Sequence, residues 1–194
     1  MRENGIGANL DSALRMAAMD GDTECVKALL DAGADVHNSV DAPLWYAAGG
    51  RHTDTMRALL DAGANQDIAL LEAAANGLTE LVRELLARGA NMHAYRGLAL
   101  MMAEHNQHAE TVAELIAAGA DLHVCDGAAL VNAAENGHTD TVRALLEAGA
   151  GLRASRRDEA MRLAAKNGHV DTVRVLKAWE ARRKRKRASA SETA

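Results

Sequence analysis

Eight histidines are the residues of this 194-residue chain best suited to bind a metal ion. Neutral imidazole is a common ligand of zinc, which needs three or four ligands that converge on one point. Seven of the eight recur at two fixed places in a pattern that repeats about every 30 residues. The first place holds His52, His108, His138 and His169, and the second holds His37, His93 and His123. One imidazole per repeat indicates a structural role, and the close pair His105 and His108 has no evident third ligand, so we predict no metal and no cofactor.

Catalytic motifs are also missing from the sequence. Serine, cysteine and acidic residues are present, but there is no G-x-S-x-G elbow, no glycine-rich phosphate loop and no glycine-flanked cysteine. Cys25 and Cys125 are too few for a disulfide framework or a thiolate metal cage, so we interpret them as small apolar side chains of a reduced protein. We therefore expect no enzymatic activity.

The amino-acid composition favours an all-α fold. Alanine and leucine together supply 66 of the 194 residues, whereas the chain has no Phe, one Pro, two Trp and two Tyr. Ala and Leu are strong helix formers, and strands are usually rich in β-branched and aromatic residues. A hydrophobic content of 48% and a charged content of 25% are ordinary for a folded domain, which argues against disorder of the whole chain.

The chain repeats itself six times, and this repetition defines its organisation. Segments of about 24 residues align without gaps, joined by six-residue linkers at most joints, two residues at one joint and seven at the last. The segments are 12–35, 42–65, 68–91, 98–121, 128–151 and 159–181. A lead of residues 1–11 precedes them, and residues 182–194 form a basic tail that we predict to be disordered.

Each segment has the pattern of two short helices. In the fifth, Leu130 and Ala133 lie three residues apart on one face of a first helix, and Asn136-Gly137 suits the turn after it. Thr139 suits the N-terminus of a second helix, which has apolar residues spaced i, i+3, i+4 and ends at a Gly-Ala pair. The unit is thus helix, turn, helix and tight glycine turn.

This pattern resembles the ankyrin repeat. Residues 133–150, AAENGHTDTVRALLEAGA, match the family's signature nearly letter for letter, but of the usual T-P-L-H opening only Pro43-Leu44 remains. A usual repeat of about 33 residues has a β-hairpin between units, and the linkers here are too short for it. The resemblance implies an ankyrin solenoid of six helix-turn-helix units with shortened or absent β-hairpins. It also implies that the first-place histidines bridge backbone groups at the inter-helix turn.

Positions on the first helices that break the repeat are candidates for binding another protein, because the solenoid does not require them. Trp, Tyr, Met and Arg are typical of protein interfaces. The candidates are Arg15, Met19, Trp45, Tyr46, Met101, Met102, Asn132 and Glu135, with Tyr95 and Arg96 from a linker. For Met101 and Met102 an equal alternative is that they fill gaps left by lost hairpins. The resulting hypothesis is a monomeric adaptor, inhibitor or effector that binds a partner protein on its concave face.

The basic run supports a second hypothesis. Arg182, Arg183, Lys184, Arg185, Lys186 and Arg187 supply six of the 22 basic residues, so that the chain before residue 180 carries a charge of −9 although the whole chain carries −5. The run could serve as a solubilising cap, as a nuclear-import or non-specific nucleic-acid segment, or as a contact for acidic surfaces. Trp179, near the end of a last segment that lacks the helix-ending glycine, is expected to cover the open end of the stack.

No membrane segment or leader is evident from the sequence. Nowhere do 18 apolar residues run together, and the first residues lack the apolar core of a signal peptide. We therefore expect a soluble cytoplasmic protein with no membrane partner, and the basic run is compatible with nuclear import in a eukaryotic cell.

Overall fold

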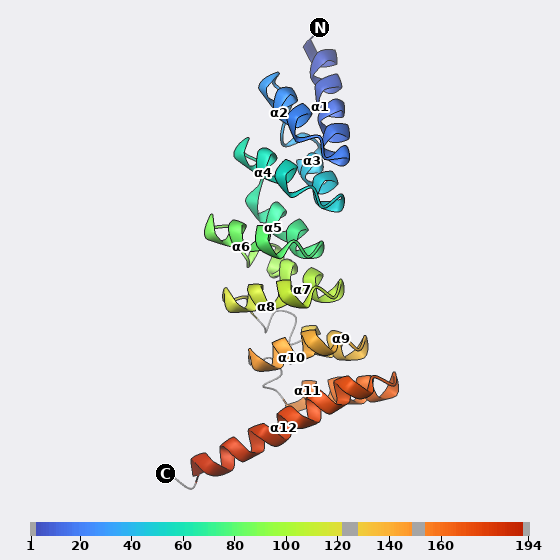
Figure 1. The fold of residues 1–194 in the computed structure, drawn as a ribbon, viewed down its shortest axis with the longest axis vertical. Helices are drawn as coiled ribbons and strands as arrows, with labels where there is room; N and C mark the ends of the chain where they lie inside the picture. The colour runs from blue at the N-terminus through green and yellow to red at the C-terminus, as the bar shows by residue number, and fades with distance from the viewer. Residues whose placement is uncertain (1–2, 122–127, 149–153, 192–194) are drawn as a thin grey trace. The chain divides into compact units, whose positions relative to one another are not determined.

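The computed structural model describes residues 3–121, 128–148 and 154–191, and these residues form twelve α-helices arranged as six helix-turn-helix pairs (Figure 1). The predicted all-α class and the six repeats are therefore confirmed. The chain divides into two compact units, residues 1–102 and residues 103–194, which are described separately below.

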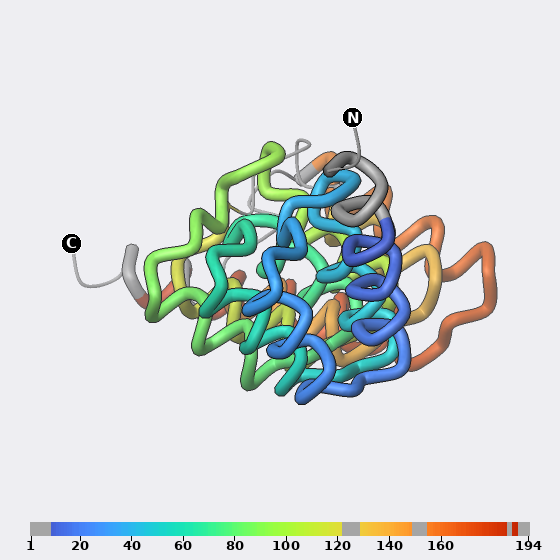
Figure 2. Tube along the Cα trace, turned by 90° about the horizontal axis from the view of Figure 1, so that it is seen from above, coloured from blue at the N-terminus to red at the C-terminus, as the bar shows by residue number. Residues whose placement is uncertain are grey.

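Unit 1 contains three complete helix pairs and the beginning of a fourth. They are α1 (Glu3–Asp20), α2 (Thr23–Asp31), α3 (Asn38–Gly49), α4 (Thr53–Asp61), α5 (Gln66–Ala75) and α6 (Thr79–Ala87), followed by the short 3-10 helix η1 (Ala94–Arg96) and by α7 (Leu98–His105), which contains the boundary between the units. Helices α1, α3 and α5 pack in one layer, and α2 packs against α4 in the other. Seen from above, these pairs lie over one another with a small offset (Figure 2).

Unit 2, taken by itself, also has two layers of helices. Its helices are α8 (Ala109–Ala117), α9 (Ala128–Glu135), α10 (Thr139–Glu147), α11 (Ala154–Lys166) and α12 (Val170–Ser191). Helix α9 packs against α11 in one layer, and α10 packs against α8 and α12 in the other.

The core consists of the repeated Leu and Ala positions. Five repeats have leucine as the third residue of the 24-residue segment, and all six have alanine as the sixth. Each of these side chains is at most 5% exposed. Leu14, Leu44, Leu70, Leu100 and Leu130 are the leucines, and Ala17, Ala47, Ala73, Ala103, Ala133 and Ala164 are the alanines. Small alanines let neighbouring first helices approach closely, which explains how a chain almost without aromatic residues fills its core.

Two first-place histidines bridge successive repeats as predicted. The His52 Nε2 lies 3.1 Å from the Met19 carbonyl oxygen, and the His169 Nε2 lies 2.9 Å from the Glu135 carbonyl oxygen. Each ring lies against the turn glycine of the preceding repeat, where a Cβ on Gly137 would come within 2.5 Å of the His169 ring. Gly137 also has a φ of +74°, so this turn requires glycine for two reasons.

The two six-residue linkers of unit 1 form left-handed turns rather than hairpins, whereas residues 66–67 lie within α5. Residues 39–41 have φ values of 52°, 60° and 59°, and residues 95–97 have 52°, 59° and 71°. The third residue of each turn, Asp41 or Gly97, is buried. No strand occurs in the parts of the chain that the structure describes, and the linker 122–127 and the stretch 149–153 lie outside them. Six residues are enough for this turn and too few for a paired finger.

The turn over residues 39–41 forces the backbone of Val40 to a φ of 60°, which is strained because a β-branched side chain disfavours positive φ. Its side chain is 77% exposed and contributes little packing. We expect Val40→Gly to raise the stability of the protein by about 1 kcal/mol and its Tm by about 2–4 °C, as measured by thermal unfolding. Val40→Ala, which keeps a Cβ, is the matched control. An equal gain in both variants would show that the backbone is not the source.

The basic run forms a helix, contrary to the predicted disorder of residues 182–194. Helix α12 continues through it to Ser191, and residues 192–194 lie outside the described part. The reason is local. In the first four repeats a glycine with φ between 92° and 98° ends the second helix, and in the last repeat Glu180 occupies that position. Without that glycine the helix continues, and cations near a helix C-terminus are favourable for its dipole. The predicted lead also differs, since α1 already begins at Glu3.

Candidate protein-binding face and basic cluster

The candidate residues of α1 and α3 lie on the exposed side of their helices. Trp45 is 60% exposed and Tyr46 is 45% exposed, while the repeated Leu44 and Ala47 beside them are buried. A shallow hollow is lined by residues of α1 together with Tyr46 of α3. These residues are Ser12, Arg15, Met16, Met19 and Tyr46. Arg15 is held by a 3.1 Å hydrogen bond that its Nη2 donates to the Ser12 Oγ.

The other candidates of unit 1 are of two kinds. Tyr95 and Arg96 are exposed in the left-handed turn before α7. Met101 and Met102, on α7, are only half-buried, whereas Met16 and Met19 are more than half exposed. The half-burial of the pair agrees with the gap-filling alternative, so the strongest binding candidates in this unit are those of α1 and α3.

In unit 2, Asn132 and Glu135 are exposed on α9, but their main chains have structural roles. The Asn132 carbonyl accepts a 2.9 Å hydrogen bond from the Asn136 amide side chain. The Glu135 carbonyl accepts a hydrogen bond from Asn167 and is the oxygen near His169. Their side chains remain candidate contacts.

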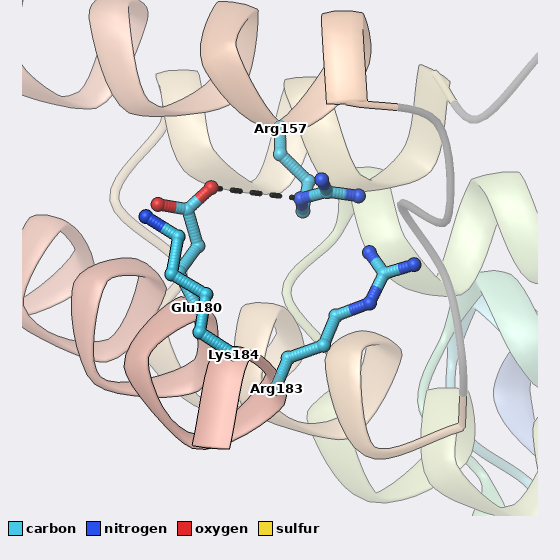
Figure 3. Close-up of a pocket in the computed structure, with 4 residues that line it drawn as sticks. All are labelled: Arg157, Glu180, Arg183 and Lys184. Carbon is cyan, nitrogen blue, oxygen red and sulfur yellow. Dashed lines mark ion pairs between the residues drawn. The ribbon is translucent and has the colours of Figure 1, made fainter. Parts of the chain in front are cut away.

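Helix α12 brings part of the basic run back onto the fold. The Trp179 indole nitrogen donates a 3.1 Å hydrogen bond to the Leu146 carbonyl near the end of α10, so the ring lies toward the preceding repeat. Two guanidinium groups lie over its ring, those of Arg157 at 5.6 Å and Arg183 at 5.4 Å from the centroid. A small cavity is lined by Arg157, Glu180, Arg183 and Lys184 (Figure 3).

Unit 2 also contains a buried carboxyl group. Glu104, on α7, is 2% exposed, and its Oε1 has no hydrogen-bond partner among the described residues. Burial raises the pKa of Glu104 to about 7. Burial lowers the pKa of the nearby His138, and His105 and His169 lower it further. A hydrogen bond between His138 and the Glu104 backbone partly opposes this shift.

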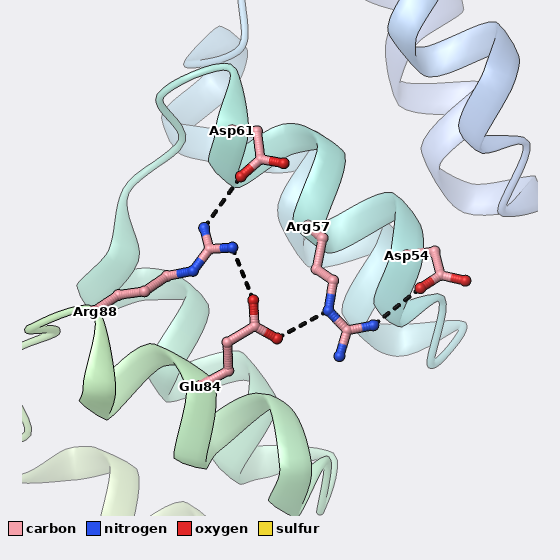
Figure 4. Close-up of polar contacts among 5 residues, drawn as sticks. All are labelled: Asp54, Arg57, Asp61, Glu84 and Arg88. Atoms are coloured by element: carbon pink, nitrogen blue, oxygen red, sulfur yellow. Dashed lines mark hydrogen bonds and ion pairs between the residues drawn. The ribbon is translucent and has the colours of Figure 1, made fainter.

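The outer face of the second helices in unit 1 is occupied by mutual ion pairs (Figure 4). Arg57 of α4 pairs with Glu84 of α6 at 2.9 Å, and Arg88 pairs with Asp61 at 3.1 Å and with Glu84 at 2.8 Å. The Glu84 carboxylate raises the pKa of Arg57. Because these charges satisfy one another across repeats, this face is a weaker binding candidate than the exposed side chains of α1 and α3.

No group of three or more His, Cys, Asp or Glu residues able to hold a metal ion occurs in the described ranges. Likewise, none of the helices searched within those ranges has both the length and the apolar content that crossing a bilayer requires.

The sequence interpretation missed the cluster around Trp179. Trp179 and Arg183 are spaced i, i+4 on one helix, a signal that the sequence did contain. Arg157 was assigned to a linker, and only its inclusion in α11 places it opposite α12.

Comparison with known proteins agrees with this architecture. A family model described as "Ankyrin repeats (3 copies)" matches residues 3–69 and 100–187, and one described as "Ankyrin repeat" matches residues 65–96. Among solved structures, the human ASB11 ankyrin repeat domain is similar, with a TM-score of 0.71 and 25% sequence identity over 86% of this chain and 81% of that one. A search of curated proteins found no match.

Proposed function

Because the chain belongs to the ankyrin repeat family, we propose that it binds a partner protein through the exposed side chains of α1 and α3. Ankyrin repeats are generally protein–protein interaction modules and are typically not catalytic. The observation that carries the proposal is the pair of adjacent aromatic residues, Trp45 and Tyr46, exposed on a helix whose other face is buried. Whether the protein acts as an adaptor, an inhibitor or an effector depends on which partner it binds.

The composition of this surface supports a protein partner. Trp45, Tyr46, Met16 and Met19 are large and apolar, and Arg15 adds one fixed charge beside the shallow hollow. Aromatic, Met and Arg side chains are enriched in the central part of protein interfaces, which contributes most of the binding free energy. An exposed apolar group of this kind is unfavourable in water and gains free energy when a partner covers it.

The test begins with partners captured from the source cell by the full chain and identified by mass spectrometry. We expect Trp45→Ala and Tyr46→Ala each to weaken the purified complex by about 2 kcal/mol, a roughly 30-fold rise in Kd by calorimetry. Lys27→Ala, on the exposed side of α2, is the control and should leave Kd within a factor of about two. Unchanged Kd in both aromatic variants, with intact helical spectra, would reject this surface.

Nucleic-acid association through the basic run is the second candidate. Helix α12 carries Arg182, Lys184 and Arg185 as exposed side chains. Binding of this type depends steeply on salt, because released counterions drive it. A loss of binding to a random-sequence duplex on raising NaCl from 50 to 200 mM, abolished by Arg182→Gln/Arg185→Gln, would support it, and a flat salt response would reject it.

A further inference from the structure

We propose that the cavity between α11 and α12, lined by Arg157, Glu180, Arg183 and Lys184, binds a phosphomonoester group carried by a partner protein. Figure 3 shows Arg157 extending from α11 toward Glu180, with the guanidinium of Arg183 turned toward the same space from α12. The cavity has a volume of about 80 Å³, which suits one tetrahedral oxyanion rather than an extended ligand. This site lies in unit 2 and does not depend on the surface of α1 and α3.

Charge is the first argument. The side chains that line the cavity are three basic ones and one acidic one, so basic groups outnumber acidic groups by two in the lining. The carboxylate of Glu180 lies 3.6 Å from the Arg157 Nε, which is an ion pair longer than a normal hydrogen bond. A phosphomonoester carries nearly two negative charges at pH 7, whereas a phosphodiester carries one. The charge surplus therefore favours the monoester.

Orientation is the second argument. Two guanidinium groups lie within 5.6 Å of the centroid of the Trp179 ring, whose own position is fixed by the hydrogen bond to Leu146. Stacking on an aromatic ring limits the freedom of a guanidinium group, and such pre-organised donors bind phosphate oxygens with little loss of side-chain entropy. The side chain of Arg157 is only 12% exposed, which strengthens its electrostatic interactions.

A nucleic acid is the less suitable ligand. A nucleic-acid site needs a track of cations along successive phosphates, and base stacking on open aromatic faces commonly accompanies it. Here the indole ring is already covered by Arg157 and Arg183, and the cavity receives a single group.

The first experiment uses inorganic phosphate as the probe at constant ionic strength. In a Trp45→Phe background Trp179 is the only tryptophan, so its fluorescence reports on the cavity. We expect a saturable change with phosphate that chloride does not produce, and a Kd at least tenfold higher in Arg183→Gln and in Lys184→Gln. Arg174→Gln, whose side chain is 74% exposed on the same helix, is the control and should bind as the parent does.

Glu180→Gln is expected to change phosphate affinity in the opposite direction from the arginine and lysine variants. It removes the carboxylate that competes with phosphate for Arg157, so phosphate should bind several-fold more tightly. A role of these residues in helix packing alone predicts no such gain. Because Arg183→Gln could disturb the stacking on Trp179, Lys184→Gln, which lies at the exposed edge, keeps the test independent of folding.

The second experiment identifies the source of the phosphate. A short glycine-serine peptide with one phosphoserine should displace inorganic phosphate at least tenfold better than its unphosphorylated form and better than a dinucleotide. A non-saturable response, equal affinity in all cavity variants, or tighter binding of the dinucleotide than of the phosphopeptide would each overturn the proposal.

Discussion

Replacing Glu104 with alanine is expected to raise the free energy of unfolding by about 2–3 kcal/mol at pH 8. The side chain is buried, its Oε1 has no hydrogen-bond partner among the described residues, and burial raises its pKa from an ordinary 4.5 to about 7. A difference of this size corresponds to about 3 kcal/mol between the two protonation states. Alanine should fit, because the other five repeats all have alanine at this position. Ala18, Ala48, Ala74 and Ala134 are buried there, and Ala165 of the last repeat is exposed.

The sign of the pH dependence follows from the direction of the shift. Since the folded state holds the Glu104 proton more tightly than the unfolded chain, stability falls as the pH rises from about 4.5 to about 7 and is then constant. His138 acts in the opposite direction, because its lowered pKa makes the folded state less stable as the pH falls below about 6.5. Only a difference between variants isolates the carboxyl group.

Urea unfolding of the parent and of Glu104→Gln at several pH values measures how the stability difference between them depends on pH. The glutamine variant keeps the size of the side chain and cannot ionise, so its advantage should be near zero at pH 4.5 and full above pH 7. Glu135→Gln, exposed on α9, is the matched control and should show no such difference. A gain of the same size at both ends of the pH range would mean that packing, not ionisation, is responsible.

The repeat pattern predicted the parts of the fold that recur. The burial of Leu44 and Ala47 was predictable because five of the six repeats have leucine at the first position and all six have alanine at the second, and such a period can be recognised without coordinates. His52 and His169 were predicted to be structural for the same reason, and both lie beside a backbone carbonyl of the preceding repeat.

Features that occur once could not be predicted in the same way. The sequence shows a glutamate at residue 104 where other repeats have alanine, but whether it is buried depends on packing in three dimensions. The length of α12 depended on the absence of a glycine, and composition alone suggested disorder for its basic end. The cavity beside Trp179 needed Arg157, which belongs to a different helix and whose position no spacing rule supplies.

The two tryptophans of the chain should differ sharply when each is replaced with alanine. We expect Trp179→Ala to lower the free energy of unfolding by about 3 kcal/mol, because the variant loses packing against α10, the hydrogen bond to Leu146 and the ring contacts with Arg157 and Arg183. We expect Trp45→Ala, at a position 60% exposed, to change it by no more than about 0.5 kcal/mol. Urea unfolding followed by circular dichroism provides both values.

Trp179→Phe separates the contributions at this site. Phenylalanine retains an aromatic ring for the two guanidinium groups and lacks the indole N–H, so the expected loss is about 1 kcal/mol, the usual net value of one hydrogen bond. Equal losses for Trp179→Ala and Trp45→Ala would contradict the role of Trp179 as a packing contact between α12 and α10. The ring that joins α12 to α10 also lies close to the two guanidinium groups, so both variants should disturb their positions as well.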